Sequence, residues 1–230
     1  MKKILLFTIM AALLFISSCE IDNYDPPTMT LDGKVTDQVT GENIFTRQPN
    51  GIKVRLLEEG YSNPVPYDFW VKPDGTFRNT KLFPAKYKVS VLEGAFEQSS
   101  AEEQIIDLSR NQTIEFKVEP YIRITGVSIS VSGNTVRATY GIQRTASTNQ
   151  MVRSLLILAK TNILHENTVG LKKSAENTLS EMTEQEILSK TFVDEISNLP
   201  AGVYYARVAV FTQNYLNRYN YSEIVKVTVN

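Results

Sequence analysis

Stretches in which apolar and polar residues alternate recur along most of this chain, and they constrain its fold more than any other feature. A period of two places every second side chain on one face of a strand, so each stretch predicts a strand with one buried face. Turn-forming residues separate the stretches at short intervals, as in β-sandwiches. The alternating stretches are 29–35, 52–56, 87–91, 114–118, 127–131, 136–140, 204–210 and 225–229. We therefore predict an all-β fold of two tandem β-sandwich domains, at residues 28–119 and 120–230.

Three further segments refine this prediction. Residues 73–75 are Pro-Asp-Gly, a turn sequence, so we expect a hairpin whose return strand begins at Thr76. Residues 155–159 are apolar throughout, which is typical of a strand buried on both faces. Residues 172–189 are polar and irregular, with a possible capping box of Thr183 and Glu186, so we expect a long loop with at most a short helix.

The first residues have the pattern of a bacterial secretion signal. Two lysines follow the initial methionine, and residues 4–16 are apolar apart from one threonine. This run is too short to cross a bilayer, which needs about 20 residues, but it suits a signal peptide. Ser17 and Ser18 precede the single cysteine, Cys19, and the segment resembles a lipobox. We predict that residues 1–18 are a lipoprotein signal peptide and that Cys19 is lipidated, which anchors the protein to a membrane.

Residues 19–27 follow as an acidic segment that ends in two prolines, and we interpret them as a tether. Acidic residues directly behind a lipidated cysteine resemble the surface-export signal of Bacteroidetes lipoproteins. The resemblance implies an outer-membrane protein that faces the cell exterior. A plain linker that faces the periplasm remains the alternative.

The first predicted domain resembles the carboxypeptidase-regulatory, transthyretin-like sandwich. The motifs that carry the resemblance are Gly33-Lys34-Val35-Thr36-Asp37, Thr40-Gly41-Glu42, Asp74-Gly75-Thr76-Phe77 and the run from Leu82 to Val89. Ala85 and Lys86 stand where that family usually has a glycine. The regulatory domain is not a peptidase, so the resemblance implies no catalysis.

The second predicted domain resembles immunoglobulin and fibronectin type III sandwiches. Residues 199–208 contain the leucine, proline, glycine and tyrosine of the corner motif in these folds. Two adjacent tyrosines, Tyr204 and Tyr205, could be the corner residue, and the sequence does not distinguish them.

One further resemblance rests on the segments 19–25, 48–51, 55–59, 64–70 and 218–222. Through them the chain from residue 19 to residue 230 resembles an uncharacterised family of two-domain surface lipoproteins encoded in Bacteroidetes polysaccharide-utilisation loci. The family has no residue-level function to transfer.

Several classes of function find no support in the sequence. The net charge is −1 with both signs mixed along the chain, so no basic surface for nucleic acid is expected. The single histidine, His165, has no partner for a metal or catalytic site, and we interpret it as a solvated loop residue. Carboxylate pairs for glycoside hydrolysis cannot be read from the sequence, but two small domains leave little room for a deep active site. We expect a protein that is not an enzyme and uses no metal or cofactor.

Two aromatic clusters remain as candidate ligand-binding sites. The first lies at residues 61–70, and the second, at residues 214–221, interleaves tyrosine with asparagine. Tyrosine and tryptophan offer an apolar face with a polar group, which suits sugar rings, and the same residues also serve protein recognition. Alternatively, the tryptophan belongs to the core and the second cluster is a packed hairpin. The candidate binding residues are Tyr67, Trp70, Tyr215, Asn217, Tyr219 and Tyr221.

The sequence thus supports the hypothesis of a non-catalytic surface lipoprotein that binds polysaccharide or oligosaccharide as an accessory of a polysaccharide-uptake system. The alternative is a structural subunit that docks onto an outer-membrane transporter complex through the edges of its sandwiches.

Overall fold

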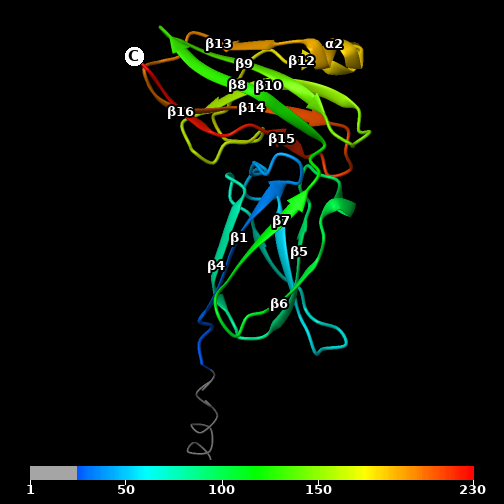
Figure 1. The fold of residues 1–230 in the computed structure, drawn as a ribbon. Helices are drawn as coiled ribbons and strands as arrows, with labels where there is room; N and C mark the ends of the chain where they lie inside the picture. The colour runs from blue at the N-terminus through cyan, green and yellow to red at the C-terminus, as the bar shows by residue number, and fades with distance from the viewer. Residues whose placement is uncertain (1–24) are drawn as a thin grey trace, which may run out of the picture.

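The structure of the chain, a computed structural model, describes residues 25–230 and consists of two β-sandwiches (Figure 1). The strands of the first sandwich run toward one sheet of the second, whose strands lie across them. The predicted signal peptide and the predicted lipidation site, Cys19, lie outside the described residues.

The first sandwich is built from a three-stranded and a four-stranded sheet. In the three-stranded sheet, of order β4-β1-β7, β1 pairs antiparallel with β4 and parallel with β7. The other sheet is antiparallel, with the order β3-β2-β5-β6. The strands are β1 (Met29–Asp37), β2 (Lys53–Glu58), β3 (Tyr67–Trp70), β4 (Thr76–Leu82), β5 (Lys86–Leu92), β6 (Gln104–Asp107) and β7 (Gln112–Val118), and η1 (Gln98–Ser100) is a 3₁₀ turn.

The prediction of a hairpin around residues 73–75 is wrong. A local turn does form, since the Lys72 backbone N–H donates to the Thr76 carbonyl at 2.8 Å. However, β3 pairs with β2 and β4 pairs with β1, so the turn connects the two sheets. Phe77 explains why β4 belongs to β1: a side chain at Gly33 would have its Cβ 2.2 Å from Phe77 Cζ, so the phenyl ring lies directly on the glycine. The buried ring, rather than the turn sequence, decides the pairing.

The second sandwich also contains two sheets. One has the order β13-β9-β8, and the other has β10 and β14 at its centre, flanked by β11, β12, β15 and β16. The elements are β8 (Ile122–Ser132), β9 (Thr135–Arg144), β10 (Met151–Ala159), β11 (Lys172–Lys173), β12 (Asn177–Thr178), η2 (Leu179–Glu181), α2 (Glu184–Ser189), β13 (Phe192–Ile196), β14 (Gly202–Thr212), β15 (Tyr219–Tyr221) and β16 (Val225–Val229).

Two sequence predictions for this sandwich are confirmed, but the expected long loop at 172–189 also contains the short strands β11 and β12 and the 3₁₀ turn η2. All side chains from Leu155 to Ala159 are buried, as expected for a strand covered on both faces. Helix α2 begins at the predicted capping box, in which the Thr183 side chain accepts from the Glu186 backbone N–H and the Glu186 side chain accepts from the Thr183 N–H. Ile187 of this helix packs into the core between the sheets.

Each sandwich contains a tyrosine whose hydroxyl donates to the carbonyl four residues earlier. Tyr204 Oη donates to the Pro200 carbonyl at 2.9 Å, so Tyr204 is the corner residue and Tyr205 is not. Tyr87 Oη makes the equivalent bond to the Phe83 carbonyl at 3.1 Å. Both tyrosines are buried, so each one attaches the loop before its strand to the core of its sandwich.

The prediction of an all-β fold of sandwich domains is confirmed. No helix among residues 25–230 is long and apolar enough to cross a bilayer.

Candidate functional site

The outer face of the β10-β14-β15 sheet packs against the end of the first sandwich (Figure 1). Along β14, Tyr204, Ala206 and Val208 point into the core of the second sandwich. The residues between them point outward, yet Arg207 and Ala209 are also fully buried. They are buried because Phe45 of the first sandwich and the loop after β10 cover this face. The cluster formed there contains Leu155, Ile157, Ala159, Leu164, Ala209 and Tyr221.

Arg207 lies at the centre of this contact. Its guanidinium carbon is 3.6 Å from the ring centroid of Tyr221, and its Nη1 donates to the Thr46 carbonyl of the first sandwich at 3.0 Å. Its Nε and Nη2 have no partner among the described residues. Glu166 accepts from both the Tyr221 hydroxyl and Arg47. Burial lowers the pKa of Arg207 to about 10, so it stays charged at neutral pH.

A second polar contact joins the sandwiches beside the linker. Arg123 of β8 donates to Asp37 at the end of β1 through Nε at 2.5 Å and Nη2 at 2.9 Å, and it also contacts Glu119. All three side chains are nearly buried. Burial alone would raise the pKa of Asp37, but the hydrogen bonds from Arg123 and from the backbone of Val39 and Thr40 outweigh it and lower the pKa.

The segment 214–221 makes the third contact. Arg218 Nε donates to the Glu93 carbonyl at 2.9 Å, and Asn220 Nδ2 donates to the Ala95 carbonyl at 2.8 Å. With the contacts of Arg207 and Arg123, these bonds tie the two sandwiches together at three places. These contacts hold the two sandwiches in one relative orientation, and this orientation determines the shape of the space between them.

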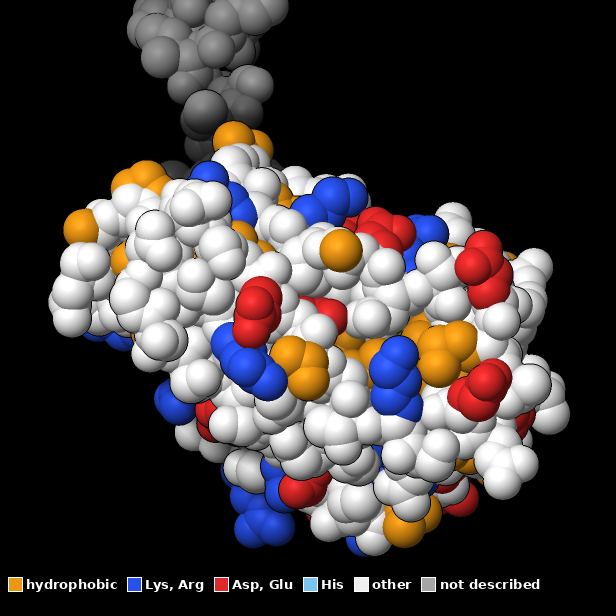
Figure 2. Space-filling view, turned by 90° about the horizontal axis from the view of Figure 1, so that it is seen from above, with side chains coloured by type: hydrophobic (Ala, Val, Ile, Leu, Met, Phe, Trp, Pro, Cys, Tyr) orange, Lys and Arg blue, Asp and Glu red, His pale blue; other side chains and the backbone are white. Residues whose placement is uncertain are grey.

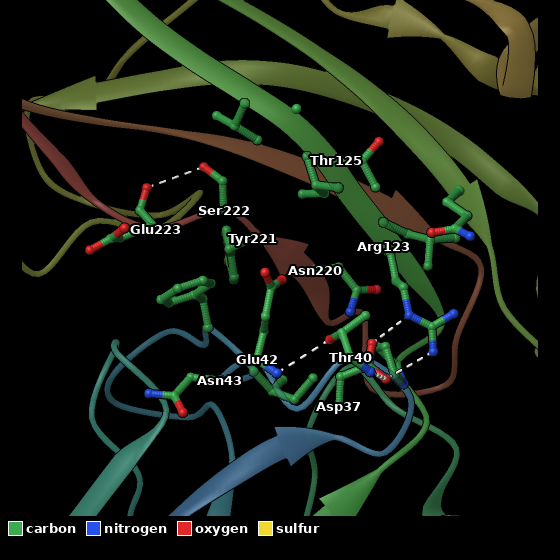
Figure 3. A pocket seen from close by; sticks show the side chains of 18 of the residues that line it. Asp37, Thr40, Glu42, Asn43, Arg123, Thr125, Asn220, Tyr221, Ser222 and Glu223 are labelled. Atoms are coloured by element: carbon green, nitrogen blue, oxygen red, sulfur yellow. Dashed lines mark hydrogen bonds and ion pairs between the residues drawn. The ribbon is translucent and has the colours of Figure 1, made fainter.

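A cleft of about 460 Å³ opens at this junction (Figure 3). The loop after β1, the first half of β8 and the segment around β15 form its walls. Glu42 points from the first sandwich into the cleft toward Asn220 and Tyr221 of the second. Its lining includes Asp37, Thr40, Glu42, Asn43, Phe45, Arg123, Thr125, Gln143, Asn220, Tyr221, Ser222 and Glu223.

The cleft combines free carboxylates with amides and an apolar floor. Glu42 and Glu223 are exposed and form no ion pair within the described residues, whereas Asp37 is neutralised by Arg123. Asn220 is buried, and its Oδ1 has no hydrogen-bond partner in the described part of the chain. A buried amide oxygen without a donor is costly, by about 1–3 kcal/mol, so it would accept a hydrogen bond from a ligand hydroxyl. Such a mixture of planar polar groups and apolar surface suits a small polyhydroxylated ligand.

The second predicted aromatic cluster does not form one binding surface. Tyr221 is only 6% exposed and contributes to the cleft wall, with its ring under Arg207, so it is not available as a platform for stacking. Tyr219 is half-buried, 6.0 Å from Tyr221 between ring centroids, and its hydroxyl accepts from Arg153 Nε at 3.0 Å. Tyr215, by contrast, is 80% exposed, and Asn217 beside it is exposed with a φ of 53°. Only these two stay free at the surface.

The first cluster is also divided. Tyr67 and Phe69 share the core-facing side of β3, and the Tyr67 hydroxyl accepts from Asn79 Nδ2 at 3.2 Å. Trp70 points to the opposite side of the sheet, where Lys53 Nζ lies 5.2 Å from the ring centroid. Tyr67 is 47% exposed and Trp70 is half-buried, so they cannot bind one sugar ring together. The alternative that places the tryptophan in the core does not hold either, because Trp70 does not belong to the core cluster.

His165 differs from the expectation of a solvated residue. It is half-buried in the loop that covers Arg207, and its Nδ1 accepts from the Asn167 backbone N–H at 3.2 Å. Burial lowers its pKa, so it is neutral at physiological pH. Among residues 25–230, no group of three or more His, Cys, Asp or Glu side chains is placed to hold a metal ion.

Sequence reasoning missed most of the cleft. Glu42 and Phe45 lie in the loop after β1, Arg123 lies in β8 and Glu223 follows β15, and no motif links these three segments. The signal that could have pointed there is the asparagine and serine content around Tyr221, in a segment predicted to be either a binding loop or a packed hairpin.

The face of the second sandwich away from the junction carries charges of both signs. Figure 2 shows Lys, Arg, Asp and Glu side chains scattered over it with small separate hydrophobic areas. On this face Arg137 of β9 pairs with Glu195 of β13 at 3.4 Å. We therefore take the junction cleft as the candidate site.

Comparison with solved structures supports the two-domain architecture. The chain resembles a candidate carbohydrate binding protein from Bacteroides uniformis with 20% identity and a TM-score of 0.72, over 88% of this chain and 100% of that one. It resembles a DUF3823 family protein from the same species with 21% identity and a TM-score of 0.74, over 89% and 100% of the chains. A DUF3823 family protein from Parabacteroides merdae matches with 24% identity and a TM-score of 0.71, over 88% and 100%. At these identities the likeness shows the fold.

No curated protein matches the chain. Residues 29–119, the first sandwich, match the family model described as the N-terminal domain of a protein of unknown function, DUF3823. The first sandwich of this chain is thus similar to the DUF3823 N-terminal domain.

Proposed function

We propose that this chain is a non-catalytic, lipid-anchored surface protein that binds glycans in the cleft between its two sandwiches. The observation that carries the proposal is that two hydrogen-bond acceptors line the cleft from opposite sides of the junction. They are the exposed Glu42 carboxylate and the buried Asn220 Oδ1, which has no partner among the described residues. Both are acceptors for sugar hydroxyls, and the half-buried ring of Phe45 supplies an apolar surface against which a sugar ring can pack.

The rigidity of the junction supports binding. Because Arg123, Arg207 and Arg218 already fix the two sandwiches, a ligand would not have to order them. Preorganisation of this kind lowers the entropic cost of association. The description of one similar structure, from Bacteroides uniformis, as a candidate carbohydrate binding protein agrees with the proposal.

The test is a broad glycan array, followed by affinity electrophoresis on the polysaccharides that give a binding signal on the array. We expect binding by the wild-type protein and a loss of about tenfold in affinity for Glu42→Gln, since a hydrogen bond to a charged group contributes about 1.5–3 kcal/mol. Glu102→Gln is the matched control, because Glu102 is an exposed carboxylate outside the cleft. Absence of binding to every glycan would refute the proposal.

The alternative is an interaction subunit of an outer-membrane transporter complex, and one observation favours it. Strand β8 is 11 residues long and lies at the edge of its sheet, so it offers main-chain groups to an added strand. Co-purification from native membranes distinguishes the two functions. A partner that is retained by Glu42→Gln, together with no affinity for any glycan, favours the interaction subunit.

A further inference from the structure

The junction cleft continues beyond Phe45 and Glu223. These two residues line the cleft on one side and a second hollow of about 460 Å³ on the other. The second hollow lies against the outer surface of β14 and β16, and it is bounded by the 71–75 turn of the first sandwich and by the loop after β10. Its lining includes Gln48, Lys72, Asp74, Asn162, Tyr205 and Lys226.

The opposite end of the cleft is also open. Thr125 and Gln143 line both the cleft and a further hollow of about 370 Å³, together with Ile142, Arg144 and Leu188. The three hollows therefore follow one another through shared residues, from α2 past the junction to the loop after β10. Each has a volume within the range of about 300–1,000 Å³ that is typical of ligand sites.

The second hollow has the same chemical character as the cleft. Tyr205 is half-buried, pairs with Lys226 across β14 and β16, and presents an aromatic surface. Asn162 and Lys226 are exposed and supply donors beside it. An aromatic ring flanked by an amide and an ammonium group is a second place where a sugar unit can pack and donate or accept hydrogen bonds.

We infer that the hollows form one extended groove and that its ligand is a linear oligosaccharide of several units that runs from the junction cleft past Phe45 and Glu223 to Tyr205. This inference rests on the proposed function and adds the class of ligand. A single sugar would fill one hollow and leave the others to water, whereas a chain uses all of them. Tyr205 then acts as a remote subsite for long ligands.

The experiment measures affinity by calorimetry for ladders of cello-, xylo-, manno- and arabino-oligosaccharides, from disaccharides to octasaccharides, with the full mature protein. We expect affinity to rise with chain length in the ladder that binds. Tyr205→Ala should weaken long chains by roughly threefold to tenfold, in line with the contribution of an aromatic contact, and leave the shortest binding chain unchanged. Glu42→Gln should weaken short and long chains alike.

Asn162→Ala provides a second variant on an exposed loop, where a loss of folding is not expected. Two results would overturn the extended groove and leave glycan binding intact. One is an affinity that does not change with chain length. The other is that Tyr205→Ala and Asn162→Ala both bind long chains as tightly as the wild type does. Absence of binding to all ladders and to the array would overturn the proposed function, and the groove with it.

Discussion

The guanidinium carbon of Arg207 lies 3.6 Å from the centroid of the Tyr221 ring, and Arg207 is fully buried where the two sandwiches meet. One N–H group of Arg207 reaches the first sandwich, at the Thr46 carbonyl. Two further guanidinium nitrogens, Nε and Nη2, have no partner in the described residues. The residue therefore combines a favourable stack on an aromatic ring with the cost of a charge that is incompletely hydrogen-bonded.

The balance of these two effects gives the first prediction. Arg207→Ala should lower the free energy of unfolding by about 2–5 kcal/mol, because it removes the stack and leaves a cavity at the junction. Arg207→Met, of similar length and without a charge, should cost much less, since buried ionic groups replaced by well-packed apolar ones are often neutral. Urea denaturation measures both. Equal losses in the two variants would show that the charge itself stabilises the junction.

The contact between Asp37 and Arg123 predicts how the junction responds to acid. The pKa of Asp37 is lowered in the fold from its ordinary value of 3.8, so the unfolded chain takes up this proton first. The stabilisation is complete above pH 3.8 and is lost as the pH falls through the lower pKa of the folded state. Asp37→Asn should reduce the loss of unfolding free energy on acidification below about pH 4, measured by urea denaturation at a series of pH values. An unchanged pH profile would contradict this role.

Asp194 of the second sandwich should change stability with pH in the direction opposite to Asp37. It accepts from Asn177 Nδ2 at 2.8 Å and from the Tyr140 hydroxyl at 2.9 Å, but burial outweighs these bonds and raises its pKa above 3.8. The folded state therefore binds this proton more tightly than the unfolded chain, and stability should decrease as the pH rises from 3.8 through the raised pKa.

Asp194→Asn should remove that decrease and leave the response of Asp37 in place. The comparison variant is Tyr140→Phe. It should lower the free energy of unfolding by about 1–3 kcal/mol, because Asp194 and Ser154 each lose the hydrogen bond from the Tyr140 hydroxyl. The same urea series reports both changes. Stability of Asp194→Asn that still falls over this pH range would show that another group titrates there.

The sequence was sufficient for the features that depend on local pattern. The apolar run predicted β10, and Thr183 with Glu186 predicted the start of α2. Alternation predicted β1, β2, β5, β7, β8, β9, β14 and β16, but it did not predict shorter strands such as β6 and β13. It was insufficient where distant segments compete for one partner. The turn at 73–75 indicated a hairpin, but burial of Phe77 against Gly33 placed β4 beside β1.

The candidate site shows the same limit. Tyr215 and Tyr221 each follow an asparagine in the sequence, yet Tyr215 is exposed and Tyr221 is buried. The difference arises because the first sandwich covers the face of β15 and leaves the preceding loop at the surface. Periodicity within one strand cannot reveal that a second domain covers its outward face.

This difference predicts distinct behaviour for the two tyrosines. Tyr221→Ala should destabilise the protein by about 3–5 kcal/mol, as for other buried aromatic residues, since it removes the ring beneath Arg207. Tyr215→Ala should change stability by less than about 0.5 kcal/mol, because the side chain is exposed. Thermal denaturation distinguishes them, and a comparable stability loss for Tyr215→Ala would contradict the exposed position of its side chain. Burial raises the pKa of Tyr121 to about 12, with smaller contributions from Glu97 and Tyr215.

The last prediction concerns the anchor. Strand β1 begins at the end of the first sandwich far from the second (Figure 1), so a lipid on Cys19 would attach the protein through the end that is distant from the junction cleft. Mass spectrometry of protein from native membranes should find a chain that begins at Cys19 and carries acyl groups. Cys19→Ala should shift the protein from the membrane to the soluble fraction, because two or more acyl chains are needed for stable attachment. An unmodified thiol on a chain that retains residues 1–18 would contradict both the anchor and this point of attachment.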